Sequence, residues 1–466
     1  MADSWATSGV DLHLELTGRP VRAGLEAALR EAVRAGRLRP GSRLPSSRAL
    51  SRDLGLARNT VADAYGQLVA EGWLAARPGS GTVVAERPAP VEPAVPIDVA
   101  GHHPTRYDLR TGSPDLTAFP RSAWLAAARR ALAVAPADTL GYGDPRGLPV
   151  LRQALADYLS RARGVRASPD RIVVCSGFTQ GLSLVCQALR SGGAGAVGME
   201  SYSYRGHREV VAATGLRVVT MPVDTGGAVL DDLTADAAVL TPAHQFPLGM
   251  PLAPARRTAA VRRAARLDSW LVEDDYDGEF RYDRQAVGAL QALAPERVIY
   301  AGTASKSLAP GVRLGWLVLP AALVGPVTAA KAVADRQTGS LDQLALAEFI
   351  SSGGYDRQIR RCRLSYRRRR DTLLAALRRQ VPAIRLTGVA AGLHTLALLP
   401  PGQQEDTAVA RAARHGVGIE GVRTYHAGGP EHPPALVIGY GTPPPHAFST
   451  AVARLTAALR DDTPLP

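Results

Sequence analysis

The sequence predicts an α/β protein preceded by a small helical domain, and three observations support this prediction. After residue 106, short apolar runs of strand type alternate with helical stretches, a pattern typical of a largely parallel sheet covered by helices. Before residue 85, three helical patterns precede two short β-prone runs. Residues 86–105 are rich in proline and lack periodicity, which indicates a linker. We therefore expect domains at residues 10–85 and 106–466.

Length, composition and charge limit the class of protein. The chain has 466 residues, 46% of them hydrophobic, and a net charge of +13, so two or three domains with sizeable cores are expected. The sequence has neither a signal-peptide pattern nor a long uncharged apolar span, and we expect a cytoplasmic protein that does not enter a membrane. Cys175, Cys186 and Cys362 form no CxxC pair, so we interpret them as core residues and expect no metal site.

The first domain has the pattern of a winged helix-turn-helix. Its first helical stretch is "VRAGLEAALREAVRAGRL". In "LPSSRALSRDLG", Ser46 or Ser47 is the expected helix cap and Gly55 the stop. In "ARNTVADAYGQLVAEGW", the spacing of Val61, Tyr65 and Leu68 sets them on one buried face. The two β-prone runs of "LAARPGSGTVVA" flank a turn and so predict a hairpin, the wing.

This fold indicates which residues meet double-stranded DNA. The second helix of such a motif enters the major groove with its first residues, here Arg58, Asn59 and Thr60. Arg48 on the preceding helix is placed for a phosphate, and the wing sequence Gly79, Ser80 and Gly81 permits close approach to the backbone. A lone arginine is more often a solvated charge, so the ordered set carries the inference. The stretch 44–84, with "LPSSR", "RNTVADAY" and "GSGT", resembles the GntR-type winged helix.

Lysine is rare in this chain. Of 55 basic residues, only Lys306 and Lys331 are lysines. Arginine can serve in salt bridges and phosphate contacts, but its guanidinium stays protonated and forms no Schiff base, whereas a lysine amine can condense with an aldehyde. Lys306, in "GTASKSLAPGVRLGW", is therefore a candidate anchor for an aldehyde cofactor.

Pyridoxal phosphate requires an amine, an anion at its ring nitrogen, donors for its phosphate and phenolate, and a flat contact for its ring. Asp274, at the end of "SWLVEDDY", is the candidate partner of the ring nitrogen, and Tyr276 is the candidate donor to the phenolic oxygen. Tyr204 is a candidate for stacking. Taken alone, each tyrosine is explained as a core residue and the aspartate as a solvated acid. The order of these residues along the chain favours a cofactor-binding site.

The phosphate of that cofactor has its own candidate donors. The stretch "CSGFTQGLS" follows a strand and opens a helix, so the backbone amides of Gly177, Phe178 and Thr179 would face a phosphate at the positive helix end. Two hydroxyls and a guanidinium flank the lysine, and the planar guanidinium suits a phosphate. These three residues are Thr303, Ser305 and Arg313.

Residues 106–460 resemble the fold-type I aminotransferases, and four motifs match the regulator branch of that superfamily: "YGDPRGLPVLR", "TPAHQFPLG", "EDDYDGEFRY" and "GTASKSLAPGVRLG". With the winged helix, nearly the whole chain resembles MocR-type transcriptional regulators, with a lean towards the pyridoxine-synthesis branch. The resemblance implies a large α/β sheet with a small C-terminal α+β subdomain, pyridoxal 5'-phosphate bound as an aldimine of Lys306, and His244 and Gln245 near its ring. It also implies a head-to-tail, domain-swapped homodimer in which Tyr142 reaches the partner's phosphate.

One departure from the aminotransferases concerns the substrate carboxylate. Their carboxylate-binding arginine belongs to an R-x-x-F or R-x-G-F element, whereas the stretch here is "ALVIGYG", which puts Val437 at that position. A missing bidentate donor disfavours turnover of amino acids, and we assign no catalytic residue. Arg423 is an alternative donor, although the abundance of arginine argues against it. The run Arg360–Asp371 is expected to form the solvated face of a long helix, with contact to bent DNA as the alternative.

Three functions remain open at this stage. The first is a regulator that binds an operator and senses pyridoxal phosphate itself, the interpretation that Val437 favours. The second is a regulator that senses an amino acid or amine through the cofactor. The third is an active aminotransferase with a DNA-binding appendage.

Overall fold

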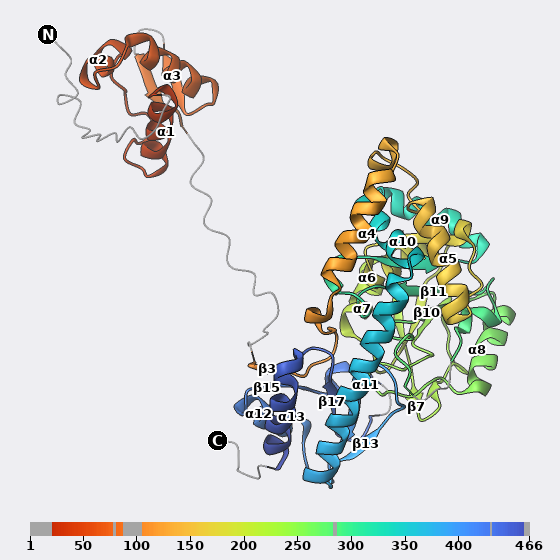
Figure 1. Ribbon diagram of the computed structural model, residues 1–466. Helices are drawn as coiled ribbons and strands as arrows, with labels where there is room; N and C mark the ends of the chain where they lie inside the picture. Colours follow the sequence, from red (N-terminus) through yellow and green to blue (C-terminus); the bar gives the residue numbers. More distant parts are fainter. Residues whose placement is uncertain (1–20, 78–80, 87–104, 283–286, 429–430, 461–466) are drawn as a thin grey trace. The chain divides into compact units, whose positions relative to one another are not determined.

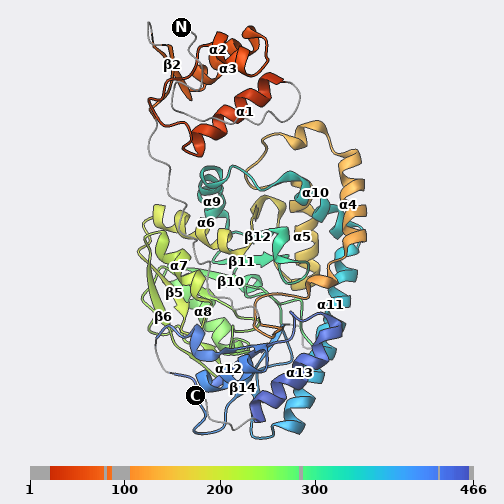
Figure 2. The same cartoon turned by 90° about the vertical axis from the view of Figure 1, so that its left-hand side faces the viewer.

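The computed structural model describes residues 21–77, 81–86, 105–282, 287–428 and 431–460. It divides the chain into two compact units, Met1–His102 and His103–Pro466, and each has its own hydrophobic core (Figures 1 and 2). Among the described helices, none has the length and apolar character that a bilayer span requires.

The N-terminal unit is the winged helix-turn-helix that the sequence predicts. Its elements are α1 (Val21–Arg34), α2 (Ser47–Asp53), α3 (Arg58–Ala70), β1 (Leu74–Arg77) and β2 (Gly81–Val84). Ser46 is the cap of α2, because its hydroxyl accepts a hydrogen bond of 3.1 Å from the amide of Ala49. Val61, Tyr65 and Leu68 are buried on one face of α3, as predicted, and β1 pairs antiparallel with β2.

The C-terminal unit is built on a seven-stranded sheet. In spatial order its strands are β4 (Ile172–Cys175), β12 (Gly315–Val318), β11 (Val298–Thr303), β10 (Trp270–Asp274), β9 (Ala237–Leu240), β5 (Ala196–Glu200) and β6 (Arg217–Met221). Only β12 runs antiparallel to its neighbours, so the prediction of a largely parallel α/β sheet is confirmed. Each of the seven strands coincides with an apolar run that the sequence indicates.

Helices cover both faces of this sheet (Figure 2). Val173 of β4 packs into one core with the first set of helices, and its neighbour Val174 packs into another core on the opposite face. The first set comprises α6 (Phe178–Ser191), α7 (Arg205–Ala213) and α9 (Ala321–Ala334). The opposite face is covered by α5 (Pro149–Arg163) and α8 (Pro254–Arg266). Helix α10 (Ser340–Ser351) packs against α5, and α4 (Arg121–Val134) packs against α10.

A smaller C-terminal subdomain follows α10, as the sequence predicts. The long α11 (Gly354–Gln380) leads into an antiparallel sheet of β13 (Arg385–Thr387), β14 (His394–Leu398), β17 (Ala435–Gly439) and β16 (Glu420–Gly421). Two helices, α12 (Glu405–Arg414) and α13 (Pro445–Arg460), pack with it. Short strands complete the unit: β3 (Tyr107–Asp108) pairs with β15 (Val417–Gly418), and β7 (Val223–Asp224) pairs with β8 (Gly227–Ala228).

Two further expectations concern single residues of this unit. Cys175, Cys186 and Cys362 are free and buried, which agrees with their interpretation as core residues. The arginine run on α11 is largely exposed, as predicted, except at Arg369. The guanidinium of Arg369 is buried because it pairs with Asp115 at 2.6 Å, a tertiary contact that helical periodicity does not reveal.

Candidate functional site

The predicted cofactor residues gather where central strands of the large sheet end. Strands β4, β10 and β11 run in the same direction, so their carboxyl ends meet at one edge. Thr303, the last residue of β11, and Cys175, the last of β4, both pair with Gly315 on the strand between them. A Cβ atom on Gly315 would lie 2.8 Å from the Cα of Gly177, so glycine is required for this approach.

Lys306 lies in the turn that follows β11, and its side chain is half-buried. Its ammonium donates a hydrogen bond to the carbonyl oxygen of Gly112. Burial lowers the pKa of Lys306 below its ordinary value, although Asp274 and Asp277 oppose the shift. Lys331 is fully buried, and its ammonium is held in an ion pair with Asp335 at 2.6 Å. Of the two lysines, only Lys306 is available as a nucleophilic amine.

Asp274 is buried at the end of β10. Burial, together with the adjacent Asp275, raises its pKa well above the ordinary range, and Lys306 counteracts this. Within the described residues, its carboxylate forms no hydrogen bond or ion pair shorter than 4 Å. A buried acid of this kind needs a partner, and the protonated nitrogen of a pyridine ring would be one, so Asp274 fits the role predicted for it.

An anion-binding corner is formed by the start of α6 and Arg313. Gly177 is the N-cap residue of α6, with a φ of 93°. As a glycine it has no side chain to cap the first amides of the helix. The first amides of a helix, here those of Phe178 and Thr179, lack partners within the helix. The guanidinium of Arg313 donates to the carbonyl of Ser176 and lies 3.3 Å from where a Cβ of Gly177 would be. Amides and guanidinium together suit a phosphate, as predicted.

The two hydroxyl residues beside Lys306 are present but engaged with each other. The hydroxyl oxygens of Thr303 and Ser305 are 2.8 Å apart, and the amide of Ser305 donates to Thr303 Oγ1 at 3.2 Å. These bonds shape the turn that carries Lys306. A contact from either hydroxyl to a phosphate remains a prediction.

Tyr276 is linked to a buried histidine and acid. Its hydroxyl donates to the carbonyl of His244 at 3.1 Å, and Nδ1 of His244 lies 2.8 Å from Asp277 Oδ2. The sequence does not single out Asp277, because only the folded chain brings it against His244. Gln245 holds the same loop, because its amide nitrogen donates to the carbonyl of Tyr202 at 2.8 Å.

Tyr204 and Tyr142 are the two aromatic residues of the predicted cofactor set that are exposed. Tyr204 precedes α7 and is 55% exposed, and its ring centroid lies 5.1 Å from that of His207. His207, also missed from the sequence, contacts the ring of Phe178 as well, and burial, with Lys306 nearby, lowers its pKa to about 4. Tyr142 is 84% exposed and carries the guanidinium of Arg336 over its ring at 4.9 Å. The predicted ring stacking and partner contact stay predictions.

The predicted DNA-reading residues lie at the start of α3 and on α2. Arg58 and Asn59 are exposed at the first turn of α3, with Thr60 half-buried, and Arg48 is exposed on α2. Gly81 begins β2 with a φ of 85°, whereas Gly79 and Ser80 lie outside the described residues. Arg43, which the sequence analysis missed, lies beside Gly81, with its Nε atom 3.5 Å from where a Cβ would be.

Val437 lies in the middle of β17, opposite Leu396, and is fully buried in an apolar cluster with Tyr202 and Leu248. This position therefore offers no donor for a carboxylate. Arg423 is exposed in the short helix Val422–Tyr425.

Comparisons with known proteins agree with both units. Residues 22–84 match the family "Bacterial regulatory proteins, gntR family", and residues 107–432 match "Aminotransferase class I and II". The chain is 34% identical to the HTH-type pyridoxine biosynthesis transcriptional regulator PdxR of Corynebacterium glutamicum, over 93% of this chain and 95% of the relative. It is also 34% identical to the probable rhizopine catabolism regulatory protein MocR of Rhizobium meliloti, over 78% of each.

A solved structure with the same fold is that of LysN, an α-aminoadipate aminotransferase of Thermus thermophilus, complexed with N-(5'-phosphopyridoxyl)-L-leucine. It shares 26% identity and superposes with a TM-score of 0.66, covering 76% of this chain and 92% of the enzyme.

Proposed function

The chain belongs to the MocR-type family, DNA-binding transcriptional regulators that join a GntR winged helix-turn-helix to a class I and II aminotransferase domain, and from this premise we propose that it binds pyridoxal 5'-phosphate at Lys306 and senses that cofactor. The observation that carries the proposal is the set of three groups at one sheet edge: the amine of Lys306, the buried carboxylate of Asp274 and the anion corner of α6 with Arg313.

Each of these groups has a distinct task in holding the cofactor, which would supply an aldehyde and an electron-accepting ring. Lys306 presents an amine whose lowered pKa favours the neutral, reactive form. Asp274 is the buried carboxyl group that would become the anionic partner of a protonated ring nitrogen once the ring is bound. The N-terminus of α6 and Arg313 would bind the phosphate and so fix the position of the ring. The hydroxyl proton of Tyr276 is donated to the carbonyl of His244 in this structure, and it would turn to the phenolic oxygen when the cofactor binds.

The choice of pyridoxal phosphate itself as the signal rests on two observations. A relative that matches nearly the whole chain is named a regulator of pyridoxine biosynthesis. In addition, Val437, which we align with the carboxylate-binding arginine of the aminotransferases, is a buried apolar side chain. A site that anchors the cofactor but lacks this donor favours sensing of the cofactor over turnover of amino acids.

We further propose that the chain acts as a homodimer. Large apolar side chains are exposed on α4, α9, α10 and the segment after α4, which a monomer would leave in water. Among them are Leu125, Val134, Leu140, Tyr142, Val333 and Leu341. A symmetric dimer would cover such a surface, and Tyr142 would then be available to a partner's phosphate. A head-to-tail arrangement of the DNA-binding units belongs to the same proposal.

The experiment is to compare operator binding by protein with and without cofactor, together with a test of turnover. Affinity that changes when pyridoxal phosphate alone is added supports the proposal. A change that requires an added amino acid or amine would favour the second function, an amine-sensing regulator. Steady production of keto acid would favour the third, an active aminotransferase.

A further inference from the structure

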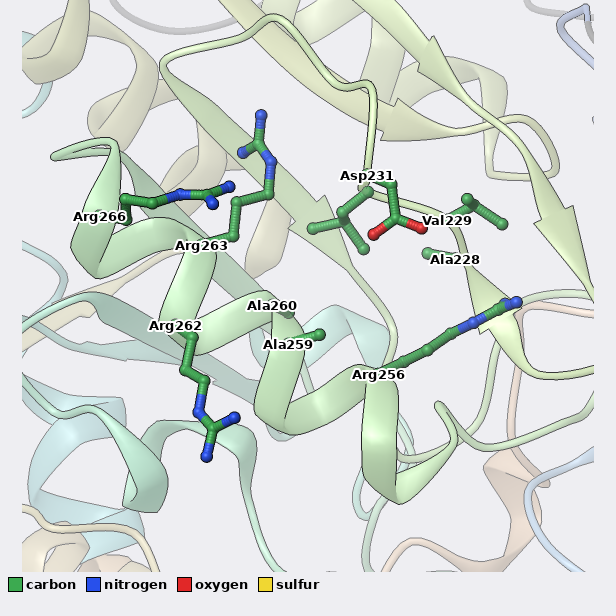
Figure 3. Close-up of a pocket in the computed structure, with 10 residues that line it drawn as sticks. Ala228, Val229, Asp231, Arg256, Ala259, Ala260, Arg262, Arg263 and Arg266 are labelled. Carbon is green, nitrogen blue, oxygen red and sulfur yellow. The ribbon is translucent and has the colours of Figure 1, made fainter.

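A cavity of about 380 Å³ lies beside α8, and none of its residues belongs to the candidate cofactor site (Figure 3). Small and apolar residues form part of its lining: Ala228, Val229 and Leu230 after β7, and Ala259 and Ala260 on α8. The remaining lining residues are Arg256, Arg262, Arg263, Arg266 and Asp231. Four arginines and a single acidic residue thus border the cavity, and we call it the arginine cavity.

Arg256 lines one side of the arginine cavity, and Asp224 neutralises its charge. Its two terminal nitrogens lie 2.5 and 2.6 Å from the carboxylate oxygens of Asp224. It also donates to the carbonyl of Gly227 at 2.7 Å. This network ties α8 to the β7–β8 hairpin and holds one side of the cavity in place.

The charge of Arg263 is not compensated in this way. One terminal nitrogen donates to the carbonyl of Leu233, but Nε is buried and has no hydrogen-bond partner within the described residues. Burial and the nearby Arg266 lower the pKa of Arg263, while Asp231 opposes the shift. A buried donor without a partner is costly, and a guanidinium with one hydrogen bond to a backbone carbonyl gains from a further acceptor at its terminal nitrogens.

Arg266 provides a second guanidinium that no carboxylate of the described residues neutralises. In Figure 3, Arg263 and Arg266 extend from the same side of α8, three residues apart, whereas Arg262 points the other way. In the part of the chain that the structure describes, Arg266 forms no hydrogen bond and no ion pair. Two adjacent guanidiniums with one carboxylate nearby leave a net positive charge that a multivalent anion would balance.

We propose that the arginine cavity binds the phosphate group of a small organic anion. Arg263 and Arg266 donate to the phosphate oxygens through the terminal nitrogens of their guanidinium groups. The alanines, Val229 and Leu230 contact the organic part of the ligand. Lys306 is not among the lining residues, so this ligand would not occupy the proposed cofactor site.

The test is a calorimetric titration of the full-length protein with inorganic pyrophosphate at fixed ionic strength. In the variant Arg263→Ala/Arg266→Ala, we expect affinity to fall by about tenfold or more, because two charge-assisted contacts are lost. The matched control is Arg378→Ala/Arg379→Ala, which removes the same charge from the exposed end of α11 and should bind like the unmodified protein. Equal weakening in both variants would mean a general charge effect and would overturn the proposal.

Two further variants separate this cavity from the cofactor's anion corner and from misfolding. Ala259→Glu changes an exposed helical residue and puts a carboxylate into the cavity, so it should weaken pyrophosphate binding without unfolding α8. Arg313→Ala, at the anion-binding corner of α6, should leave the affinity for pyrophosphate unchanged. Binding that is lost only in Arg313→Ala would assign pyrophosphate to α6 and overturn the proposal.

Discussion

Arg163 and Asp275 form a two-bonded ion pair in the interior of the C-terminal unit. Nε and Nη2 of Arg163 lie 2.7 and 2.9 Å from the two carboxylate oxygens, and both side chains are buried. The hydroxyl of Tyr300 donates to the same carboxylate at 2.7 Å. Because Asp275 directly follows Asp274, this pair compensates the charge beside the acid that we assign to the ring nitrogen.

We predict that Arg163→Leu strongly destabilises the C-terminal unit, because it leaves the carboxylate of Asp275 buried without a partner. The free energy of unfolding should fall by about 3–5 kcal/mol. Urea denaturation of cofactor-free protein measures it. The control is Arg161→Ala, which removes the ion pair of the exposed Arg161 with Asp356. This change should lower the free energy of unfolding by about 1 kcal/mol or less. Similar losses in the two variants would contradict the role given to the buried pair.

The anchoring lysine has a direct chemical test. Protein with bound pyridoxal phosphate should absorb in the near-ultraviolet or visible range, and Lys306→Ala should abolish this band while the fold is kept. Reduction with borohydride followed by peptide mapping identifies the modified residue. We expect the label on Lys306, because Lys331 is committed to Asp335. Label on Lys331, or on neither lysine, would refute the assignment.

Most of the fold could be predicted from the sequence because its signals are local. Seven apolar runs coincide with the seven strands of the large sheet, and Ser46 and Gly55 delimit α2. The positions of Lys306 after β11 and of Asp274 at the end of β10 could also be predicted, because each residue stands next to a strand-like apolar run.

The residues that were missed depend on contacts between distant segments. Asp277 matters because it meets His244, and Arg369 is buried because it meets Asp115, 254 residues away in sequence. His207 lies near Lys306 only because α7 packs beside α6. No periodicity or spacing in the sequence encodes these partners, so such residues become visible only in the folded chain.

The DNA-reading assignment predicts a separation of effects between the two units. Arg58→Ala should weaken binding to the cognate operator and leave the cofactor band unchanged, because Arg58 lies in the N-terminal unit. A base contact is worth about 1–3 kcal/mol for the cognate sequence, whereas a phosphate contact would weaken all sequences alike and reduce the salt slope. A salt titration of operator affinity distinguishes these cases, with Arg22→Ala on α1 as the control.

If Arg58→Ala binds the operator as tightly as the unmodified chain at every salt concentration, residues 44–84 do not contact the operator in the way that we describe.

The buried His394 predicts a pH dependence of stability. Burial, with His244 close by, lowers its pKa from 6.5 to about 3. The unfolded chain therefore binds a proton below pH 6.5 that the folded chain does not bind, and stability falls as the pH drops from 6.5 towards 3. The slope from one such group is about 1.4 kcal/mol per pH unit.

His394→Gln should remove this contribution, because glutamine does not titrate and can still donate to the carbonyl of Pro247. Urea midpoints at pH 7 and pH 5 measure the effect, and we expect a smaller loss for the variant. The same loss in both proteins would show that His394 is not the group responsible.

The central claim is that pyridoxal phosphate is the effector, and thermodynamic linkage tests it most directly. A ligand that shifts the operator-binding equilibrium must bind the two arrangements of the protein with different affinities, and the operator must then change the cofactor's affinity by the same factor. The measurement is the dissociation constant of pyridoxal phosphate with and without saturating operator DNA, at fixed salt. We predict that the two constants differ, and by the factor that separates the operator affinities of cofactor-free and cofactor-bound protein. Identical constants, together with identical operator affinities, would contradict the claim and make the cofactor a structural group or a co-sensor for an amine.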